Sequence, residues 1–135
     1  MAQITSNISN FFRDKSILAI LIGINILVYL LVLFTGIGSV LFNNEKNILL
    51  ENIHLSADPN QIIHKPWTLI TYMFTHASFW HILFNLLWLY WFGKMFQMLF
   101  GPRALSGLYF LGGIAGALLF IAAYNLFPYF SSVLH

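Results

Sequence analysis

Residues 66–93 read PWTLITYMFTHASFWHILFNLLWLYWFG and contain no Asp, Glu, Lys or Arg. Residues 16–44 and residues 104–135 are also free of these charged residues. The hydrocarbon core of a bilayer is about 30 Å thick and takes roughly 20 apolar residues of helix. Each stretch is therefore long enough for one membrane-spanning helix, and none is long enough for two helices with a turn between them.

The composition of the whole chain supports this interpretation. Of its 135 residues 59% are hydrophobic and 7% are charged, whereas a soluble domain carries about 25% charged residues. Six Lys or Arg against four Asp or Glu give a net charge of +2, too sparse for a phosphate-binding surface, so we expect no nucleic-acid partner. The absence of Cys excludes disulfides and thiolate metal sites. The sequence predicts an integral membrane protein with the lipid bilayer as a partner and no cofactor.

We predict an all-α, polytopic membrane protein with helices near residues 16–34, 81–100 and 104–127, which together make one membrane domain over residues 16–135. The first helix is too long for the apolar core of a cleaved signal peptide, which has roughly 7–15 residues, so we expect it to be retained. Residues 35–80 mix charged and apolar side chains. They predict a folded, partly helical insert in the membrane interface.

The basic residues predict how the chain is oriented in the membrane. The second and third helices are joined by the short turn Gly101-Pro102-Arg103 and must be antiparallel. In a three-span arrangement four basic residues lie on one side and two on the other: Arg13, Lys15, Lys94 and Arg103 against Lys46 and Lys65. An excess of Lys and Arg marks the cytoplasmic side. We therefore expect a multi-pass protein whose short N-terminus, residues 1–15, is cytoplasmic, with the insert on the opposite side.

Two polar residues of the second helix are candidates for a functional site. His81 and Asn85 are four residues apart and share a helix face. Both donate hydrogen bonds without carrying a full charge, as the stabilisation of a developing oxyanion requires. His76 lies about 140° away from His81 on an ideal helix, so we place it in the preceding loop or first turn. The alternative is that these residues are ordinary structural groups.

A metal site is a weaker alternative for the same histidines. The spacing of His76 and His81 is badly phased for a single helical site, and no Asp, Glu or Cys lies nearby. His54 and His64 of the insert could in principle join such a site. We therefore expect no metal.

The wider pattern resembles a known family. Pro66-Trp67-Thr68-Leu69-Ile70-Thr71, followed by His76-x4-His81-x3-Asn85 and the aromatic run to Gly93, resembles the second-helix signature of rhomboid intramembrane serine proteases. Residues 108–117, LYFLGGIAGA, are similar to the family's third helix. The resemblance implies a partial rhomboid fold and a serine-type endopeptidase that cleaves transmembrane protein substrates. It assigns His81 and Asn85 to the oxyanion hole and gives His76 a supporting role.

The resemblance also implies which catalytic groups this sequence lacks. The family's nucleophile is a Ser in a Gly-x-Ser-Gly motif that opens the fourth helix, and its general base is a His on the sixth. Ser106, in Ala104-Leu105-Ser106-Gly107, is no substitute, because the length of the second helix, about 30 Å, separates it from His81. Ser131 and Ser132 lack flanking glycines, and His135 is terminal. We therefore expect the N-terminal part of a peptidase, truncated and inactive as this chain; the alternative is a catalytically dead rhomboid-like protein that binds membrane helices.

The third helix carries a face of small residues that includes Gly112 and Gly116. Such residues let membrane helices approach closely. We expect this face either to pack within the chain or to receive a C-terminal half or another subunit. Two features depart from the family pattern: the insert has no Trp-Arg pair, and Gln97 stands where many members have a Glu.

Overall fold

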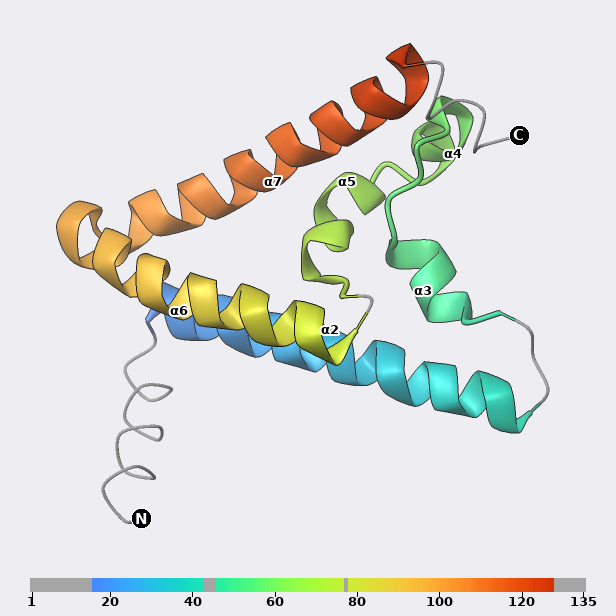
Figure 1. Cartoon of the computed structure of the whole chain (residues 1–135), viewed down its shortest axis with the longest axis horizontal. Coiled ribbons are helices and arrows are strands. Elements are labelled where there is room, and N and C mark those ends of the chain that lie inside the picture. The colour runs from blue at the N-terminus through green and yellow to red at the C-terminus, as the bar shows by residue number, and fades with distance from the viewer. Residues whose placement is uncertain (1–15, 43–45, 77, 128–135) are drawn as a thin grey trace. The chain divides into compact units, whose positions relative to one another are not determined.

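A computed structural model of the chain describes residues 16–42, 46–76 and 78–127. Every regular element in these residues is a helix, which confirms the predicted all-α class (Figure 1). The three long helices are α2 (Ile17–Leu41), α6 (Phe79–Phe100) and α7 (Pro102–Leu126). The predicted cytoplasmic N-terminus, residues 1–15, lies outside the described residues, as do Ser131, Ser132 and His135.

Two of the long helices, α2 and α7, have the length and the apolar composition of membrane-spanning helices. Helix α6 has 22 residues, about 33 Å of helix, which is enough to cross a bilayer. It does not reach the same apolarity, because it contains polar and charged side chains at His81, Asn85, Lys94 and Gln97.

Helix α2 continues to Leu41, seven residues beyond the predicted end at residue 34. The additional residues include Thr35 and Ser39, two hydroxyl residues. Inside the helix these hydroxyls are satisfied by carbonyls one turn back: Thr35 Oγ1 donates to Leu31 O (2.8 Å) and Ser39 Oγ donates to Thr35 O (2.9 Å). Because Ser and Thr can bond the helix backbone in this way, the segment remains helical.

Helices α6 and α7 both start two residues before their predicted positions. The side chain of Ser78 caps α6 by accepting a hydrogen bond from the His81 backbone N–H (3.3 Å). Helix α6 ends at Phe100, and the next residue, Gly101, has a φ of 86°, a left-handed value that glycine adopts without steric cost. Helix α7 then begins at Pro102, whose missing N–H is no loss in the first turn.

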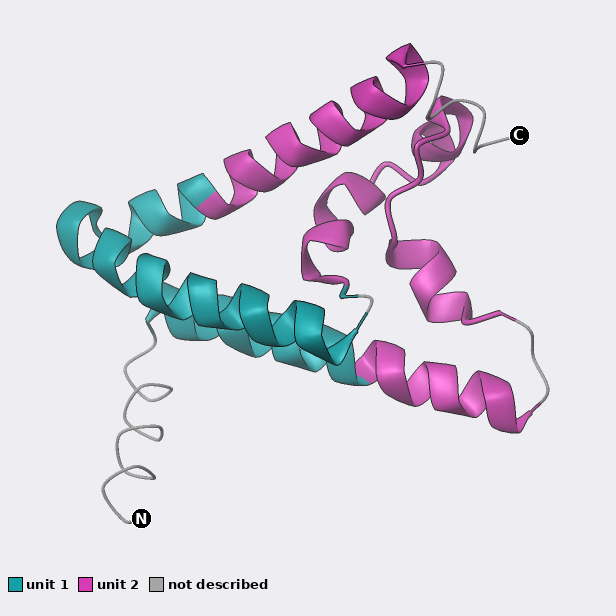
Figure 2. Ribbon diagram, viewed as in Figure 1, with its two compact units in different colours: residues 1–30, 76–108 teal, residues 31–75, 109–135 magenta. Residues whose placement is uncertain are grey.

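The chain divides into two compact units, which we describe separately (Figure 2). Unit 1 comprises residues 1–30 and 76–108, and unit 2 comprises residues 31–75 and 109–135. In unit 1 the first part of α2 lies beside α6 (Figure 1). A Cβ on Gly93 would lie 2.7 Å from Leu18 Cδ1, so the absence of a side chain permits this close approach. The apolar residues buried in unit 1 are Leu18, Ala19, Leu21, Ile22, Ile82 and Leu105.

Unit 2 contains residues 35–75 of the predicted insert, which is partly helical. Its helices are α3 (Ile48–Ile53), α4 (Pro59–His64), α5 (Thr68–Thr71) and the 3-10 helix η1 (Tyr72–Phe74). Six residues are too few for a stable isolated helix, and α3 is held by contacts at both ends. Three side chains donate to its C-terminal carbonyls: Lys65 Nζ to Glu51 O (3.1 Å), Trp67 Nε1 to Asn52 O (2.8 Å) and Thr71 Oγ1 to Ile53 O (2.8 Å).

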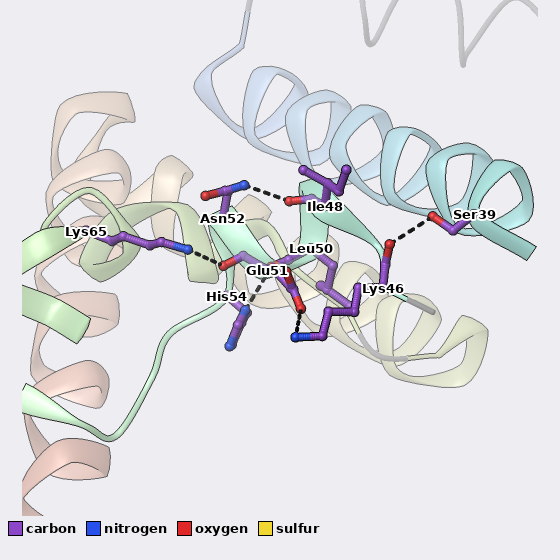
Figure 3. A network of polar contacts seen from close by, with 8 residues as sticks. All are labelled: Ser39, Lys46, Ile48, Leu50, Glu51, Asn52, His54 and Lys65. Atoms are coloured by element: carbon purple, nitrogen blue, oxygen red, sulfur yellow. Dashed lines mark hydrogen bonds and ion pairs between the residues drawn. The ribbon is translucent and has the colours of Figure 1, made fainter. Parts of the chain in front are cut away.

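The start of α3 is fastened to α2. Asn47 caps α3 by accepting from the Leu50 N–H (3.1 Å), and its amide group donates to Val32 O (2.9 Å). Figure 3 shows the neighbouring contacts: Ser39 Oγ donates to Lys46 O (3.2 Å), and Lys65 reaches Glu51 O. The described residues of the insert therefore form a folded structure rather than a loose linker.

Candidate oxyanion site

The candidate site in unit 1 begins with two histidines that the structure brings together. His81 is the third residue of α6, and its position is fixed by the Ser78 cap. His76 lies in the segment before the helix and is buried, with 6% of its surface exposed. The two rings meet edge to face, with centroids 5.3 Å apart and planes at 70°. His76 thus limits how the His81 imidazole can turn.

Asn85 follows His81 by one turn of α6, and both side chains are exposed. Residues at this spacing have Cβ atoms roughly 5–6 Å apart on the same face. Their donors can therefore converge on one small group. The first turn of a helix also carries the positive end of its dipole, and His81 lies in that turn. An oxygen that develops negative charge is favoured by both features.

The surface next to these residues is aromatic. Trp80 stacks on Phe84 with ring centroids 6.3 Å apart, and Phe79 meets Trp80 edge to face at 5.6 Å. All three rings are more than half exposed. These rings make the surroundings of the two exposed donors less polar, and hydrogen bonds are electrostatically stronger in less polar surroundings.

The structure does not bring Ser106 to this site. Ser106 lies in the second turn of α7, beyond the C-terminal end of α6, while His81 lies at the N-terminal end of that helix. Its hydroxyl donates to Arg103 O (2.9 Å), as expected for a serine near the start of a helix. Ser106 and His81 therefore lie near opposite ends of α6.

The histidines of the insert are used locally. His54 Nδ1 lies 2.8 Å from Leu50 O and His64 Nδ1 lies 2.7 Å from Asn60 O, one turn earlier in each case. Among residues 16–42, 46–76 and 78–127, no group of three or more His, Cys, Asp or Glu side chains is arranged to hold a metal ion.

Comparison with known proteins shows the family of the chain. Residues 64–130 match the family model of the Rhomboid domain. This chain belongs to the rhomboid family. It is also similar to Rhomboid-like protein 16, chloroplastic, of Arabidopsis thaliana, with 41% identity over 59 residues. That alignment covers 44% of this chain and 18% of the relative. No solved structure matches the chain.

The rhomboid match begins at His64, the last residue of α4, and includes all of α6 and α7. It therefore contains His76, His81 and Asn85. The first helix and most of the insert precede the match. The architecture of that part of the rhomboid chain is therefore described by the structure alone.

Sequence reasoning missed one buried polar residue of this rhomboid chain. Asn25, in the middle of α2, is 3% exposed, and its amide group donates to Leu21 O (2.8 Å). An Asn inside an otherwise apolar run was the available signal, because polar groups within membrane helices face the protein interior rather than lipid.

The predicted small-residue face of α7 is partly covered by the chain itself. A Cβ on Gly116 would lie 3.1 Å from Tyr72 Oη, and a Cβ on Gly113 would overlap the side chain of Met73. A Cβ on Gly112 would meet nothing within 4 Å. The sequence did not indicate Tyr72 or Met73, because neither carries a spacing signal. An outside partner at Gly112 and Gly116 stays a prediction, with the qualification that Gly116 faces the insert.

Proposed function

We propose that this chain carries the oxyanion-binding part of a rhomboid-type intramembrane serine endopeptidase that cleaves transmembrane protein substrates. The observation that carries the proposal is the His81–Asn85 face of α6, with the His76 ring packed edge to face against His81. The match of residues 64–130 to the Rhomboid domain supports it.

Each residue has a defined role in the proposed mechanism. Attack of a serine on the scissile carbonyl turns its oxygen into an oxyanion, which needs donors already aimed at it. The His81 ring N–H and the Asn85 amide N–H supply two such donors. Both groups can donate a hydrogen bond to the oxyanion without carrying a full charge. His76 acts through His81, because its buried ring restricts the orientation of that imidazole.

In this proposal the nucleophile and the general base come from other helices. Ser106 is separated from His81 by the length of α6, and acyl transfer needs the nucleophile and its base within hydrogen-bond reach. We therefore propose that the 135 residues alone do not hydrolyse peptide bonds. A serine-directed fluorophosphonate probe should leave this chain unlabelled, and labelling that Ser106→Ala abolishes would contradict this proposal.

The proposal includes a three-span topology. Helix α6 has the length of a span and is joined to α7 by the short turn at Gly101. With α2 and α7 as the other two spans, the N-terminus and this turn lie in the cytoplasm, and the insert lies on the opposite side. His81 and Asn85 are then near the outer end of α6.

The test is to restore the groups that the proposal assigns to other helices. The chain is extended by the serine-bearing and histidine-bearing helices of a rhomboid peptidase and incubated with a fluorogenic transmembrane substrate. We expect cleavage by this extended chain, and none by a matched version whose added serine is replaced by alanine. An extended chain that folds and binds the substrate without cleaving it would contradict the proposal. That result would favour the alternative of a catalytically dead protein that binds membrane helices.

A further inference from the structure

The two units of the chain differ in charge. In unit 1, whose described part is teal in Figure 2, the sequence has four basic residues and one acidic residue: Arg13, Lys15, Lys94 and Arg103 against Asp14. In unit 2 it has two basic and three acidic residues: Lys46 and Lys65 against Glu45, Glu51 and Asp58. The described part of unit 1 contains Lys94 and Arg103 and no Asp or Glu. The excess of positive charge in the chain therefore belongs to unit 1.

Lys94 and Arg103 have no acidic partner in the described part of unit 1. Lys94 Nζ lies over the Tyr90 ring, 5.8 Å from its centroid. The ring attracts the ammonium group but has no net charge, so the positive charge stays uncompensated. The guanidinium group of Arg103 makes no ion pair with any residue that the structure describes. In unit 2, by contrast, Lys46 pairs with Glu51 at 3.5 Å.

The two cations lie next to the place where three helices of unit 1 meet. A Cβ on Gly93 of α6 would lie 2.7 Å from Leu18 Cδ1 of α2 and 3.8 Å from Leu105 Cδ1 of α7. Lys94 follows Gly93 directly, and Arg103 is two residues before Leu105. Leu18 and Leu105 are buried, whereas Lys94 and Arg103 are exposed. The cations therefore lie on the surface beside a closed apolar junction.

The same end of α6 also exposes apolar side chains. Four of them are more than half exposed: Met95, Met98, Leu99 and Phe100. Lys94 is six residues before Phe100, the last residue of α6, which is about 9 Å along the helix axis. At this depth the long stem of a lysine extends along apolar surface and brings its ammonium group to the membrane interface. This end of unit 1 thus combines two uncompensated positive charges with an apolar surface.

We infer that the end of unit 1 around Lys94 and Arg103 binds an anionic phospholipid. The negatively charged headgroup supplies the anion that both side chains lack within unit 1. The acyl chains cover the exposed apolar side chains at the end of α6. A free phosphate ion would make only the first of these contacts, so a lipid fits the surface better. The inference depends on the membrane location of the chain and is independent of the oxyanion role of His81 and Asn85.

The test is lipid binding by the purified full chain in a neutral detergent, measured by native mass spectrometry. Phosphatidylglycerol is the anionic probe, and phosphatidylcholine with the same acyl chains is the control lipid without net charge. We expect tighter binding of phosphatidylglycerol, with a preference that weakens as the concentration of ammonium acetate rises, because salt screens the attraction between exposed charges. Equal affinities for the two lipids would overturn the inference.

Single substitutions locate the site on the chain. Lys94→Gln and Arg103→Gln each remove one positive charge, and each should weaken phosphatidylglycerol binding about fivefold, the contribution of one basic residue beside an anionic lipid surface. Lys94→Arg keeps the charge and should retain the affinity of the parent. The matched control is Lys46→Gln in unit 2, which removes an exposed cation that already has Glu51 as its partner. This control should leave the affinity close to that of the parent.

An equal loss of affinity in all three glutamine variants would show that binding follows the net charge of the chain, and it would overturn the assignment to Lys94 and Arg103. Unfolding midpoints in the same detergent identify variants that fold poorly. Arg103→Gln, at an exposed position in the first turn of α7, carries the test alone if Lys94→Gln does not fold.

A competition experiment distinguishes a lipid from a small anion. Glycerol 3-phosphate presents a phosphate group without acyl chains. Added at the same concentration as phosphatidylglycerol, it should displace little of the bound lipid. Displacement of half or more would show a site for a small anion only, and would overturn the assignment to a phospholipid.

Discussion

Gln97, near the end of α6, accepts a hydrogen bond from the backbone N–H of Leu18, in the first turn of α2 (3.3 Å). The same carboxamide group bonds the Ser16 hydroxyl at 3.5 Å. The first N–H groups of a helix have no partner within the helix. A side chain of α6 thus completes the start of α2, and this contact joins residues 79 positions apart in the chain.

Two replacements of Gln97 distinguish the contribution of its hydrogen-bond acceptor from the contribution of its side-chain volume. Gln97→Leu removes the acceptor at similar volume, and we expect it to lower the free energy of unfolding by about 1–2 kcal/mol. Gln97→Glu keeps an acceptor beside the positive end of the α2 dipole and should cost less. Thermal unfolding in detergent micelles measures both. A Gln97→Leu variant as stable as the parent would show that the cap contributes nothing.

Gly93 should be intolerant of a large side chain, because its Cβ position lies 2.7 Å from Leu18 Cδ1. We expect Gly93→Leu to destabilise unit 1 by about 1–3 kcal/mol through overpacking between α2 and α6. Gly107→Leu is the matched control, since nothing lies within 4 Å of its Cβ position. The same unfolding measurement applies, and equal stability of the two variants would contradict the close approach at Gly93.

Tyr72 gives a prediction for alkaline pH. Burial raises the pKa of this phenol above its ordinary value of 10.0, and a backbone hydrogen bond from Ala117 opposes part of that rise. A pKa raised in the folded state means that the stability from Tyr72 is fully present below pH 10 and is lost as the pH rises through the folded pKa. Unfolding midpoints from pH 9 to 11 should fall more steeply for the parent than for Tyr72→Phe. Parallel curves would exclude this contribution.

The predicted orientation can be measured with single cysteines. One cysteine replaces Gln3 in the N-terminus and another replaces Gln61 in the insert. Gln61 is exposed and suits labelling. Asn47 is avoided as a labelling position because its side chain caps α3. A membrane-impermeant maleimide applied to intact cells should label Gln61→Cys and leave Gln3→Cys unlabelled. Labelling at position 3 alone would mean that the excess of basic residues had predicted the wrong orientation.

Helices α2 and α7 could be predicted from the sequence because an uncharged run of about 20 residues has few alternatives in a membrane protein. The end of α2 could not be placed, because Thr35 and Ser39 indicate a break until their hydroxyl bonds within the helix are seen. The positions of the short helices in the insert could not be predicted either. Helix α3 depends on Lys65, Trp67 and Thr71, which reach it from 14 to 18 residues further along the chain.

The pairing of His81 with Asn85 could be predicted from their spacing in the sequence, because they are one turn apart on a single helix. The contact of His76 with His81 depends on the conformation of the intervening segment and on the cap at Ser78, neither of which a spacing of five residues defines. The contact in which the Tyr72 hydroxyl donates to Gly113 O could not be predicted from the sequence for a similar reason. A glycine in a membrane helix predicts close approach but does not identify which segment approaches.

The oxyanion role of Asn85 is the central claim, and turnover of an Asn85 variant in the extended enzyme tests it most directly. Removal of one oxyanion donor costs about 10²–10³ in kcat in soluble proteases. We expect a fall of this order in kcat for Asn85→Ala, with KM little changed and an unfolding midpoint close to that of the parent. Asn85→Asp keeps the size of the side chain and loses the N–H donor, so it should be at least as slow. Full turnover in either folded variant would contradict the assignment of His81 and Asn85 to an oxyanion site.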